Sequence, residues 1–556
     1  MSEKEGKKLV IVGGVAAGAT AAARARRLDE RASITIVERG RYVSFANCGL
    51  PYFISRDIAK RSSLILQTPE GFFSRYAVEV LLESEALSID REGRTVRLRD
   101  SEGERDLPYD SLILAQGGSP IDPPIPGIEA PNVFNLWTIP DMDGIHHFVE
   151  EHHAKSALVI GGGFVGLEAA EAFLKRGLAV SIVELTDHLM PPADPEFGAM
   201  IRELFRKEGA RVEVGRSVTE IVSGRARLDD GREVPADLVL VAAGVRPNLA
   251  LARAAGLAVG PAGGLVVDEH LRTSDPRIWA AGDMIEVIHR VSGRSVRLPL
   301  AGPANRQGRI AATNALGGSM SYRGALGTTI LKVLDGAFAM TGLSTASASE
   351  AGFDVRAATV HRAHHVTYFP GAEEVSLKLI YDGDSRRLLG AQAFGRAGVD
   401  KRIDVAATAL AGELTIDDLS ELDLAYAPPF GAANDPLNMA AFAAQNDLSG
   451  YSPALDAGTA WTRIAAGDAV ALDVRTLGEH LAAPIPGTLH IPLDEVADRL
   501  DELSRDREII VISEDGYAGH VALRRLAQSG FDQVEYVAGG VRSLALLPEF
   551  KFGEQE

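Results

Sequence analysis

The chain has 556 residues, of which 46% are hydrophobic and 24% charged, and its formal net charge is −19. This length predicts three or four domains with buried cores, and the negative charge argues against a nucleic acid partner. The single cysteine, Cys48, excludes an intrachain disulfide and a site with several cysteine ligands, and we expect no bound metal. We also expect no signal peptide, no membrane segment and a cytoplasmic location, because no apolar run approaches the roughly 20 residues that span a bilayer.

The first expected unit is a strand, a glycine turn and a helix. Apolar residues 8–12 predict the strand, and an alanine-rich stretch after the turn predicts the helix. The next strand, 33–37, ends at Glu38, twenty residues beyond Gly18, where a carboxylate can bond the ribose hydroxyls of a dinucleotide. The turn departs from G-x-G-x-x-G at its second glycine, which is Val15. The candidate dinucleotide contacts are Gly13, Gly14, Ala17, Gly18, Glu38 and Arg39.

The same unit recurs at residues 157–184, with a complete G-x-G-x-x-G turn. Its glycines allow the backbone to approach a pyrophosphate at the N-terminus of the following helix. The second strand of this unit ends in Glu184. A carboxylate there accepts bonds from a free 2′-hydroxyl and repels a 2′-phosphate, which favours NADH over NADPH. The expected contacts of the nicotinamide cofactor are Gly161, Gly163, Phe164, Gly166, Glu184 and Gly244.

A third motif, TSDPRIWAAGD at residues 273–283, precedes a helix that opens within residues 298–309. The order of these motifs resembles that of the FAD-dependent pyridine nucleotide-disulfide oxidoreductases. The resemblance implies that Asp283 contacts the ribityl chain of FAD. It also implies that Gly117 lies where the chain crosses between the two nucleotide domains, although Gln116 replaces the usual threonine there. Further FAD contacts implied by the resemblance are Asn47, Pro299 and Ala301.

Cys48 lies in the segment SFANCGLPY, a few residues after the first ribose acid. A free cysteine is often a buried apolar residue, but the polar neighbours Ser44 and Asn47 and an expected helix N-terminus favour a reactive thiolate. The segment resembles the signature of the coenzyme A-disulfide reductases and of their single-cysteine relatives, the NADH oxidases, NADH peroxidases and persulfide reductases. One cysteine can store an electron pair either as a mixed disulfide with a small thiol or as a sulfenic acid.

The resemblance to coenzyme A-disulfide reductases implies that the first helix and the cysteine loop hold the nucleotide of coenzyme A. Arg24 and Arg27 are three residues apart and share one helix face, as phosphate binding requires. A solvated helix face is the alternative, because the same helix also carries Arg26. The implied coenzyme A contacts are Thr20, Arg24, Arg27, Ser44, Asn47 and Arg75.

From about residue 321 onward, strands alternate with short helices, as in a separate α+β domain. This stretch resembles the dimerisation domain of the same family, in which the partner subunit brings tyrosine hydroxyls near the cysteine. The loops YFPG at 368–371 and AYAPP at 425–429 match the family's two tyrosine loops. The resemblance therefore implies a homodimer with Tyr368 and Tyr426 as catalytic residues, and Tyr426 as a proton donor to the departing thiolate. A proline-stiffened core loop is the alternative for Tyr426.

The last hundred or so residues resemble a rhodanese domain, through motifs such as LDVR at 472–475 and HIPL at 490–493. Ser513 stands where a rhodanese has its cysteine, and Ala518 where it has an arginine. The neighbouring Glu514 and Asp515 would repel an anionic sulfur donor. We therefore expect no sulfurtransferase activity from this tail, which leaves docking of a sulfur carrier or bracing of the dimer as its role.

These features predict an α/β protein with two Rossmann-like domains. The expected domains are an FAD-binding domain at 1–120 and 246–322, an inserted NAD(P)H-binding domain at 121–245, an α+β dimerisation domain at 323–446 and a rhodanese-like domain at 455–556 that lacks the usual cysteine. The expected function is FAD-dependent, NAD(P)H-driven reduction of coenzyme A disulfide, coenzyme A persulfide or polysulfide through Cys48. The alternatives are an NADH oxidase or peroxidase that cycles Cys48 through sulfenic acid, and a redox sensor or scaffold without turnover.

Overall fold

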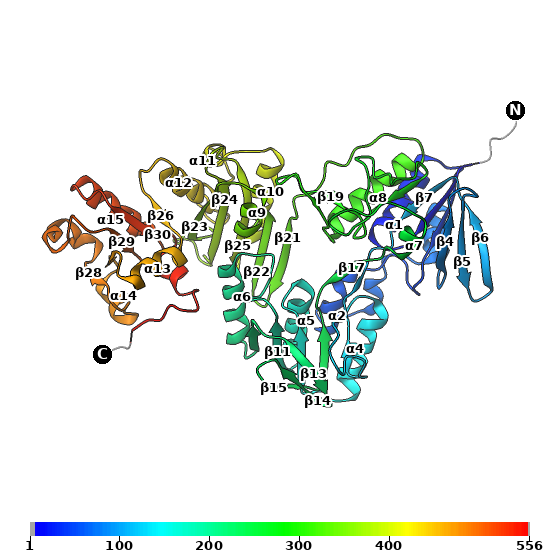
Figure 1. Cartoon of the computed structure of the whole chain (residues 1–556), viewed down its shortest axis with the longest axis horizontal. Helices are drawn as coiled ribbons and strands as arrows, with labels where there is room; N and C mark the ends of the chain where they lie inside the picture. The colour runs from blue at the N-terminus through cyan, green and yellow to red at the C-terminus, as the bar shows by residue number, and fades with distance from the viewer. Residues whose placement is uncertain (1–5, 554–556) are drawn as a thin grey trace. The chain divides into compact units, whose positions relative to one another are not determined.

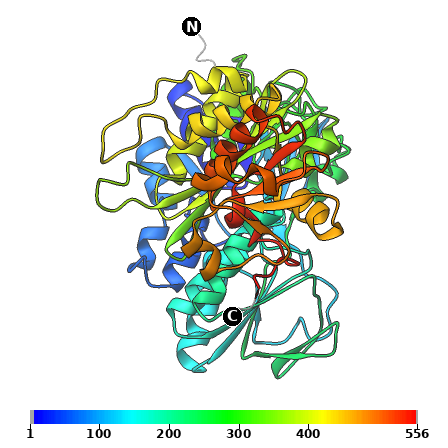
Figure 2. The same ribbon diagram turned by 90° about the vertical axis from the view of Figure 1, so that its left-hand side faces the viewer.

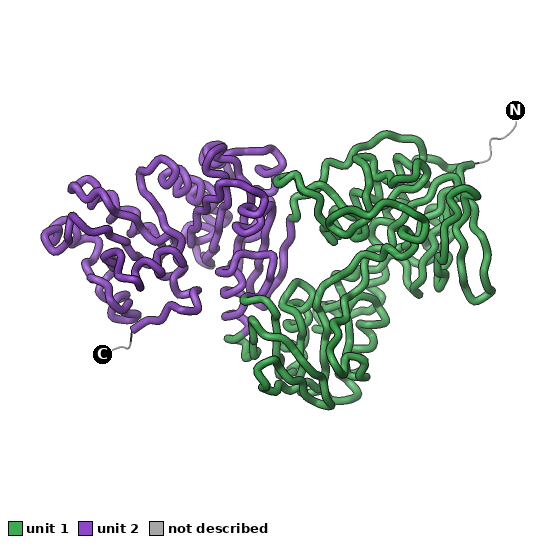
Figure 3. Tube along the Cα trace, viewed as in Figure 1, with its two compact units in different colours: residues 1–187, 206–327 green, residues 188–205, 328–556 purple. Residues whose placement is uncertain are grey.

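The computed structural model describes residues 6–553 of the chain (Figure 1). The chain forms two compact units, which are residues up to 187 with 206–327, and residues 188–205 with those from 328 onward (Figure 3). Within residues 6–553, no helix combines the length and the apolar character that crossing a membrane requires.

The first unit contains a sheet with the strand order β18-β7-β1-β2-β3, and all of its pairings are parallel. Four of the five residues of β1 are buried, as expected for a parallel strand that is covered on both faces. Helices α1 and α8 pack against each other and contact this sheet. These elements are β1 (Lys8–Val12), β2 (Ser33–Val37), β3 (Val78–Leu81), β7 (Ser111–Leu114), β18 (Ile278–Ala280), α1 (Ala16–Leu28) and α8 (Ala301–Ala315).

A second parallel sheet in this unit has the order β12-β11-β10-β16-β9. Its elements are β9 (Val133–Phe134), β10 (Ser156–Ile160), β11 (Ala179–Glu184), β12 (Arg211–Val214) and β16 (Leu238–Val241), with α4 (Ile139–Glu151) and α5 (Phe164–Lys175). The chain passes between the two sheets twice, at β8 (Gly118–Pro120) and β17 (Val245–Pro247), which pair antiparallel. Two small antiparallel sheets complete the unit, namely β4-β5-β6 (Glu85–Asp90, Thr95–Asp100, Gly103–Pro108) and β13-β14-β15 (Val218–Val222, Gly224–Leu228, Glu233–Ala236).

The second unit begins with an antiparallel sheet of order β21-β22-β25-β24-β23. Its elements are β21 (Thr329–Val333), β22 (Gly336–Gly342), β23 (Val355–Ala363), β24 (Glu374–Asp382) and β25 (Leu388–Gly395), with α10 (Val399–Ala411) and α12 (Pro436–Leu448). Residues 188–205 join this unit through Lys378 on β24, whose ammonium group pairs with Asp194 at 2.7 Å and with Glu196, in helix α6 (Pro195–Lys207), at 2.6 Å. Buried ion pairs thus attach this segment to the sheet.

The tail is a five-stranded parallel sheet of order β26-β30-β29-β27-β28, and Figure 2 turns it toward the viewer. Alternate residues of its strands enter different cores, because successive side chains of a strand point to opposite faces. The tail elements are β26 (Ala454–Leu455), β27 (Val470–Asp473), β28 (Leu489–His490), β29 (Ile509–Ile512), β30 (Val534–Val537), α13 (Ala457–Ala466), α14 (Leu477–Ala482), α15 (Tyr517–Gln528) and α16 (Gly540–Leu544). The predicted α/β class and the order of its parts are confirmed, while the exact domain boundaries stay predictions.

Candidate active site

The first glycine turn, between β1 and α1, is fixed by its backbone. Gly13 has a φ of +101°, and a side chain there or at Gly18 would come within 2.2 Å of a backbone oxygen. The carboxylate of Glu38 accepts hydrogen bonds from the amides of Gly14 at 2.8 Å and Gly40 at 2.7 Å. No side chain caps α1, so the N–H groups of its first turn are available for a phosphate. This turn therefore suits the pyrophosphate and ribose of a dinucleotide.

The second turn, between β10 and α5, repeats this geometry. Gly161 has a φ of +108°, and the buried Glu184 accepts a hydrogen bond from the amide of Gly162 at 2.6 Å. The other oxygen of Glu184 accepts the hydroxyl of Thr186 at 2.9 Å, a contact that the sequence did not indicate. A side chain at Gly163 would meet nothing within 4 Å, and no side chain caps α5. Open space beside free amides is what a pyrophosphate needs.

The crossing between the two sheets contains a buried acceptor and an open position. Asn248 donates a hydrogen bond to the backbone oxygen of Gln116 at 2.9 Å, which holds the two crossing segments together. The side-chain oxygen Oε1 of Gln116 is buried without a hydrogen-bond partner in the structure. Next to it, Gly117 has a φ of +59°, and a side chain there would meet nothing within 4 Å. A bound group with a hydrogen-bond donor would satisfy this oxygen.

Asp283 lies close to the start of α8 in sequence, and Gly282 before it donates its amide to Gln307 at 2.8 Å. Burial raises the pKa of Asp283 to about 6, because a carboxyl group that is only partly solvated is less stable in its charged form. Among the other predicted cofactor contacts, Ala17 is buried and Arg39 is exposed. Phe164 and Ala301 are the first residues of α5 and α8, Pro299 precedes α8, and Gly244 has a φ of +114°. Their contacts with a cofactor stay predictions.

Cys48 lies in a short 3₁₀ helix, Asn47–Gly49, that continues directly into α2 (Leu50–Ile54), and it is exposed. Its amide donates to Oδ1 of Asn47 at 3.0 Å, and its Sγ lies 3.7 Å from the same oxygen. Ser44 attaches this loop to the first glycine turn, because its amide donates to the oxygen of Gly14 at 2.9 Å. The fold thus places the thiol beside the expected FAD turn.

The electrostatic surroundings of Cys48 differ from the sequence expectation. Burial raises the pKa of the thiol, and the negative charges of Glu168 and Asp283 raise it further, while a backbone hydrogen bond lowers it. The expected effect of a helix N-terminus, which favours thiolate, is therefore outweighed in this structure. The physical reasons are, first, partial burial of the sulfur and, second, the two acidic groups from distant parts of the sequence that lie near it.

Glu168 is a residue that the sequence analysis missed. It lies on α5, two residues after the last glycine of the second turn, and its Oε1 accepts the hydroxyl of Tyr52 at 3.2 Å. Burial, together with Glu171, raises the pKa of Glu168 to about 7, although the bond from Tyr52 opposes this. Tyr52 follows Cys48 by one helical turn, so this hydrogen bond links the cysteine helix to the second nucleotide turn. The position of a glutamate directly after the turn was the available signal.

The predicted coenzyme A residues of α1 form a positive surface with α8. Arg24 donates to the hydroxyl of Thr313 at 3.2 Å, and its pKa is lowered by burial and by the charges of Arg309 and Arg27. Arg26 is different, because it is buried and donates to five backbone oxygens. The clustered charges of Arg24, Arg27 and Arg309 favour an anionic ligand. Of these three arginines, Arg309 was not predicted from the sequence.

The remaining coenzyme A predictions lie on the same unit. Thr20 on α1 donates its hydroxyl to Asn305 on α8 at 2.9 Å. Arg75 is exposed in the last turn of α3 (Pro69–Tyr76). Both assignments stay predictions.

Tyr368 and Tyr426 come together within the second unit. Their hydroxyl oxygens are 3.2 Å apart, and the side chains are 73% and 47% exposed. The hydrogen bond between the two hydroxyls raises the pKa of Tyr368. The two tyrosine loops thus meet within one chain, a contact that the sequence analysis did not predict. Cys48 belongs to the other unit, so the approach of these hydroxyls to a cysteine stays a prediction.

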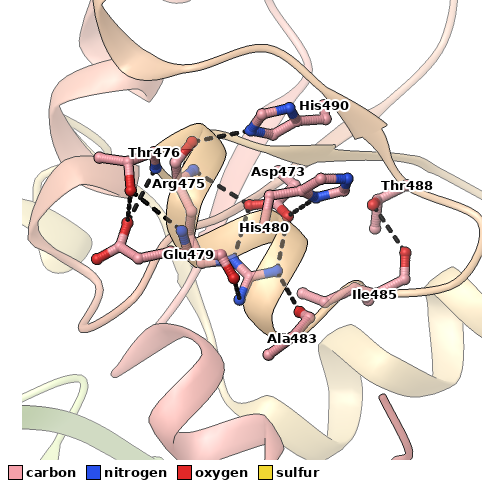
Figure 4. Close-up of polar contacts among 9 residues, drawn as sticks. All are labelled: Asp473, Arg475, Thr476, Glu479, His480, Ala483, Ile485, Thr488 and His490. Carbon is pink, nitrogen blue, oxygen red and sulfur yellow. Dashed lines mark hydrogen bonds and ion pairs between the residues drawn. The ribbon is translucent and has the colours of Figure 1, made fainter. Parts of the chain in front are cut away.

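In the tail, a buried carboxylate organises the end of β27, and the predicted replacement for the rhodanese cysteine lies in the loop after β29. Asp473, at the end of β27, accepts hydrogen bonds from Arg475 at 2.8 Å and from His480 at 2.9 Å, as Figure 4 shows. Although burial opposes it, these bonds lower the pKa of Asp473. Ser513 follows β29, is only 1% exposed, and its Oγ accepts the amide of Gly516 at 3.0 Å. The hydroxyl is therefore both a poor nucleophile and enclosed.

Three known domain families match the chain in succession. Residues 7–308 match the pyridine nucleotide-disulphide oxidoreductases, residues 329–435 their dimerisation domain, and residues 456–545 the rhodanese-like domain. The chain belongs to the pyridine nucleotide-disulphide oxidoreductase family. The family resemblance and the rhodanese-like tail predicted from sequence are confirmed.

The relatives of this oxidoreductase include proteins with the same sequence of domains. It is 40% identical to reduced Bacillus anthracis CoADR-RHD, whose crystal structure matches with a TM-score of 0.96 over 99% of this chain and 100% of that one. A NAD-dependent persulfide reductase from A. fulgidus is 38% identical, with a TM-score of 0.91 over 96% of this chain and 99% of that one. The NAD(P)H sulfur oxidoreductase (CoA-dependent) of Pyrococcus abyssi is 36% identical over 439 residues, 78% of this chain and 96% of that protein.

The family's cofactors, FAD and a nicotinamide dinucleotide, fit the residues of this oxidoreductase. Both glycine turns offer unpaired helix amides and a ribose carboxylate, and the crossing offers a buried acceptor without a partner at Gln116. The open positions at Gly117 and Gly163 leave room where a side chain would otherwise stand. The donors and the space required by two dinucleotides are thus present.

Proposed function

We propose that this oxidoreductase uses NAD(P)H and FAD to reduce coenzyme A disulfide, coenzyme A persulfide or polysulfide through Cys48. The observation that carries the proposal is the exposed thiol of Cys48, which lies on a loop hydrogen-bonded to the first glycine turn. The same unit contains the cluster of Arg24, Arg27 and Arg309. A lone cysteine has no partner for an intrachain disulfide, so any disulfide that it forms is a mixed one with an external thiol. Clustered arginines suit the phosphates of coenzyme A. The names of the three relatives support the same substrate class.

The chain's own residues account for cofactor binding and for the sulfur step. The first turn with Glu38 and Asp283 holds FAD, and the second turn with Glu184 holds NADH. When bound, the flavin carries an electron pair from the nicotinamide to the cysteine. The Cys48 thiolate attacks one sulfur of coenzyme A disulfide, so that one coenzyme A leaves as thiolate and the other stays attached to Cys48. Two electrons then reduce this mixed disulfide, which releases the second coenzyme A and restores the thiolate.

The two tyrosines supply the proton in this scheme. The protein acts as a homodimer, and the linked hydroxyls of Tyr368 and Tyr426 serve the cysteine of the other subunit. A hydroxyl that accepts a bond from its neighbour can donate its own proton to the departing thiolate. The dimerisation domain matched at residues 329–435 supports this arrangement. We place the enzyme in the cytoplasm, where reducing conditions keep a lone thiol free.

The test is NADH oxidation by the purified flavoprotein without oxygen. Coenzyme A disulfide, coenzyme A persulfide and polysulfide are offered separately, and air is admitted afterwards. We expect rapid oxidation with a sulfur acceptor, which Cys48→Ser abolishes while NADH still reduces the flavin. Oxidation that starts only when air is admitted would assign Cys48 to oxygen chemistry and overturn the proposal. Because thiol exchange needs the thiolate, a serine cannot replace it.

A further inference from the structure

The loop that carries Tyr368 lies between two strands that both contact the tail. Strand β23 ends at Ala363 and β24 begins at Glu374, so the loop spans residues 364–373. A pocket of about 630 Å³ is bounded by this loop on one side and by tail residues Asp515 and Arg542 on the other. The tail therefore forms part of the surroundings of Tyr368 within the second unit.

Charged side chains of the tail pair with residues at both ends of this loop. At the β23 end, the guanidinium group of Arg362 lies 4.0 Å from the carboxylate of Asp515 and 5.8 Å from the ring centre of Tyr517. At the β24 end, Glu374 pairs with Arg542, which also bonds Glu514 at 3.4 Å. The acids that would repel a sulfur donor are thus used in contacts with cations.

A buried histidine lies at the same junction. Nε2 of His361, on β23, lies 3.0 Å from the hydroxyl of Ser543 on α16, and its Nδ1 lies 2.8 Å from the hydroxyl of Ser376. Burial and the nearby Arg542 lower the pKa of His361 to about 4, so the ring is neutral at physiological pH. A side chain at Gly539 would come within 2.7 Å of this ring, so the tail approaches β23 closely.

We propose that the tail residues 513–517 and Arg542 form a clamp that holds both ends of the 364–373 loop and so positions Tyr368. The residues that replace the sulfurtransferase nucleophile and its surroundings thereby act on the reductase through contact with the dimerisation domain. Tyr368 is a catalytic residue only under the proposed function, on which this part of the inference rests. Asp515, Arg362 and Arg542 are positioning residues.

The sheet already joins the two ends of the loop, because Ala363 on β23 pairs with Glu374 on β24. The contacts of Arg362 and Glu374 with the tail add side-chain restraints at these same ends. Inside the loop, the amide of His364 bonds the oxygen of Glu373 at 2.8 Å, and the amide of Val366 bonds the oxygen of Gly431 at 3.1 Å. Gly431 follows the 425–429 loop, which carries Tyr426. A displaced 364–373 loop would therefore also disturb the 3.2 Å contact between the hydroxyls of Tyr368 and Tyr426. The clamp therefore affects the geometry of the pair as well as of Tyr368.

The test is a charge-swap cycle in the full-length flavoprotein, made of Asp515→Arg, Arg362→Asp and the double variant. Amide hydrogen exchange of residues 364–373 is followed by mass spectrometry. We expect each single variant to exchange this loop about tenfold faster, because local opening becomes easier, and the double variant to return toward the native rate. Arg505→Asp is the matched control, because its hydrogen bonds go to Ser529 and Gly530 within the tail.

Two results would overturn the clamp. One is an unchanged exchange rate of residues 364–373 in both single variants. The other is a double variant in which the two effects add as free energies, so that its rate increase is the product of the two single increases. Turnover with coenzyme A disulfide is measured alongside, and we expect kcat to fall in the single variants while flavin reduction by NADH keeps its rate. If the enzyme uses neither coenzyme A disulfide, coenzyme A persulfide nor polysulfide, the proposed function fails, and the exchange data still decide whether the tail holds the loop.

Discussion

At the scale of single residues, the charge of Glu168 controls the acidity of Cys48. Glu168 gains its negative charge as the pH rises through about 7, and that charge raises the pKa of the thiol. Removing it with Glu168→Gln should lower the thiol pKa, because the thiolate is no longer repelled. We expect iodoacetamide to alkylate Cys48 about threefold faster at mildly alkaline pH, which corresponds to about half a pKa unit. The measurement is the alkylation rate against pH, read by mass spectrometry.

The matched control for this prediction is Glu171→Gln, one turn further along α5. Glu171 raises the pKa of Glu168, whereas the direct influences on Cys48 are burial, Glu168, Asp283 and a backbone hydrogen bond. We expect this control to change the alkylation profile less than Glu168→Gln does. Equal profiles for native protein and Glu168→Gln would show that the two groups are not coupled.

The proposed preference for NADH over NADPH rests on one residue. The buried carboxylate of Glu184 lies at the ribose end of the second turn, where its charge disfavours a 2′-phosphate. Glu184→Gln removes the charge and keeps an acceptor for the amide of Gly162. We expect the ratio of kcat/KM for NADPH to that for NADH to rise roughly tenfold, about 1.4 kcal/mol. Glu38→Gln at the first turn serves as control, and a shift of the same size there would contradict the assignment of the two sites.

At the scale of elements, the packing of α1 against α8 builds the predicted phosphate site. Arg24 on α1 faces Thr313 and Arg309 on α8, so neither helix makes this surface alone. We expect Arg24→Ala to raise the KM for coenzyme A disulfide about fivefold with little change in kcat, because ground-state binding is lost. The effect should shrink at high salt, as for any screened charge. Steady-state kinetics at two ionic strengths measure both quantities.

Arg26 provides the contrast on the same helix. Its guanidinium group satisfies backbone oxygens of the α3 and β2 connections, so Arg26→Ala leaves buried acceptors without a donor. We expect a lower melting temperature by several degrees, about 1–3 kcal/mol, and a KM for coenzyme A disulfide that stays within twofold in the folded fraction. A KM effect equal to that of Arg24→Ala would argue that the whole helix binds substrate.

At the scale of the molecule, the tail keeps the sulfurtransferase framework but lacks the catalytic group. Asp473 pairs with Arg475 and His480 at the end of β27 (Figure 4). Ser513 is buried, and Glu514 follows it in the sequence. We expect Ser513→Cys to leave thiosulfate:cyanide sulfurtransferase activity at background, because the acids disfavour an anionic donor and the arginine position is Ala518. Sulfurtransferase activity of the Ser513→Cys variant well above that of the Cys48→Ser variant would contradict this expectation.

Local patterns were enough to predict the nucleotide turns and the rhodanese-like tail, while the reactivity of Cys48, the role of the tyrosine loops and the inactivity of the tail stay predictions. Strands at residues 8–12 and 33–37 were predicted with the bounds they have, because apolar runs beside glycine turns are local signals. The positive φ angles of Gly13 and Gly161 explain why those turns require glycine. The sequence itself likewise shows the single cysteine Cys48, the serine at position 513 and the two loops that combine tyrosine with proline.

The tertiary structure decided which distant side chains meet. Tyr52 and Glu168 are 116 positions apart, and Arg24 and Thr313 are 289 apart, so no periodicity or spacing relates them. The acidity of Cys48 was misjudged for the same reason, because charge and burial act through space. The contacts of Arg362 with Asp515 and of Glu374 with Arg542 also depend on how the tail packs against β23 and β24. Pair interactions between separate elements arise only when the chain is folded, which is why they had to be read from the structure.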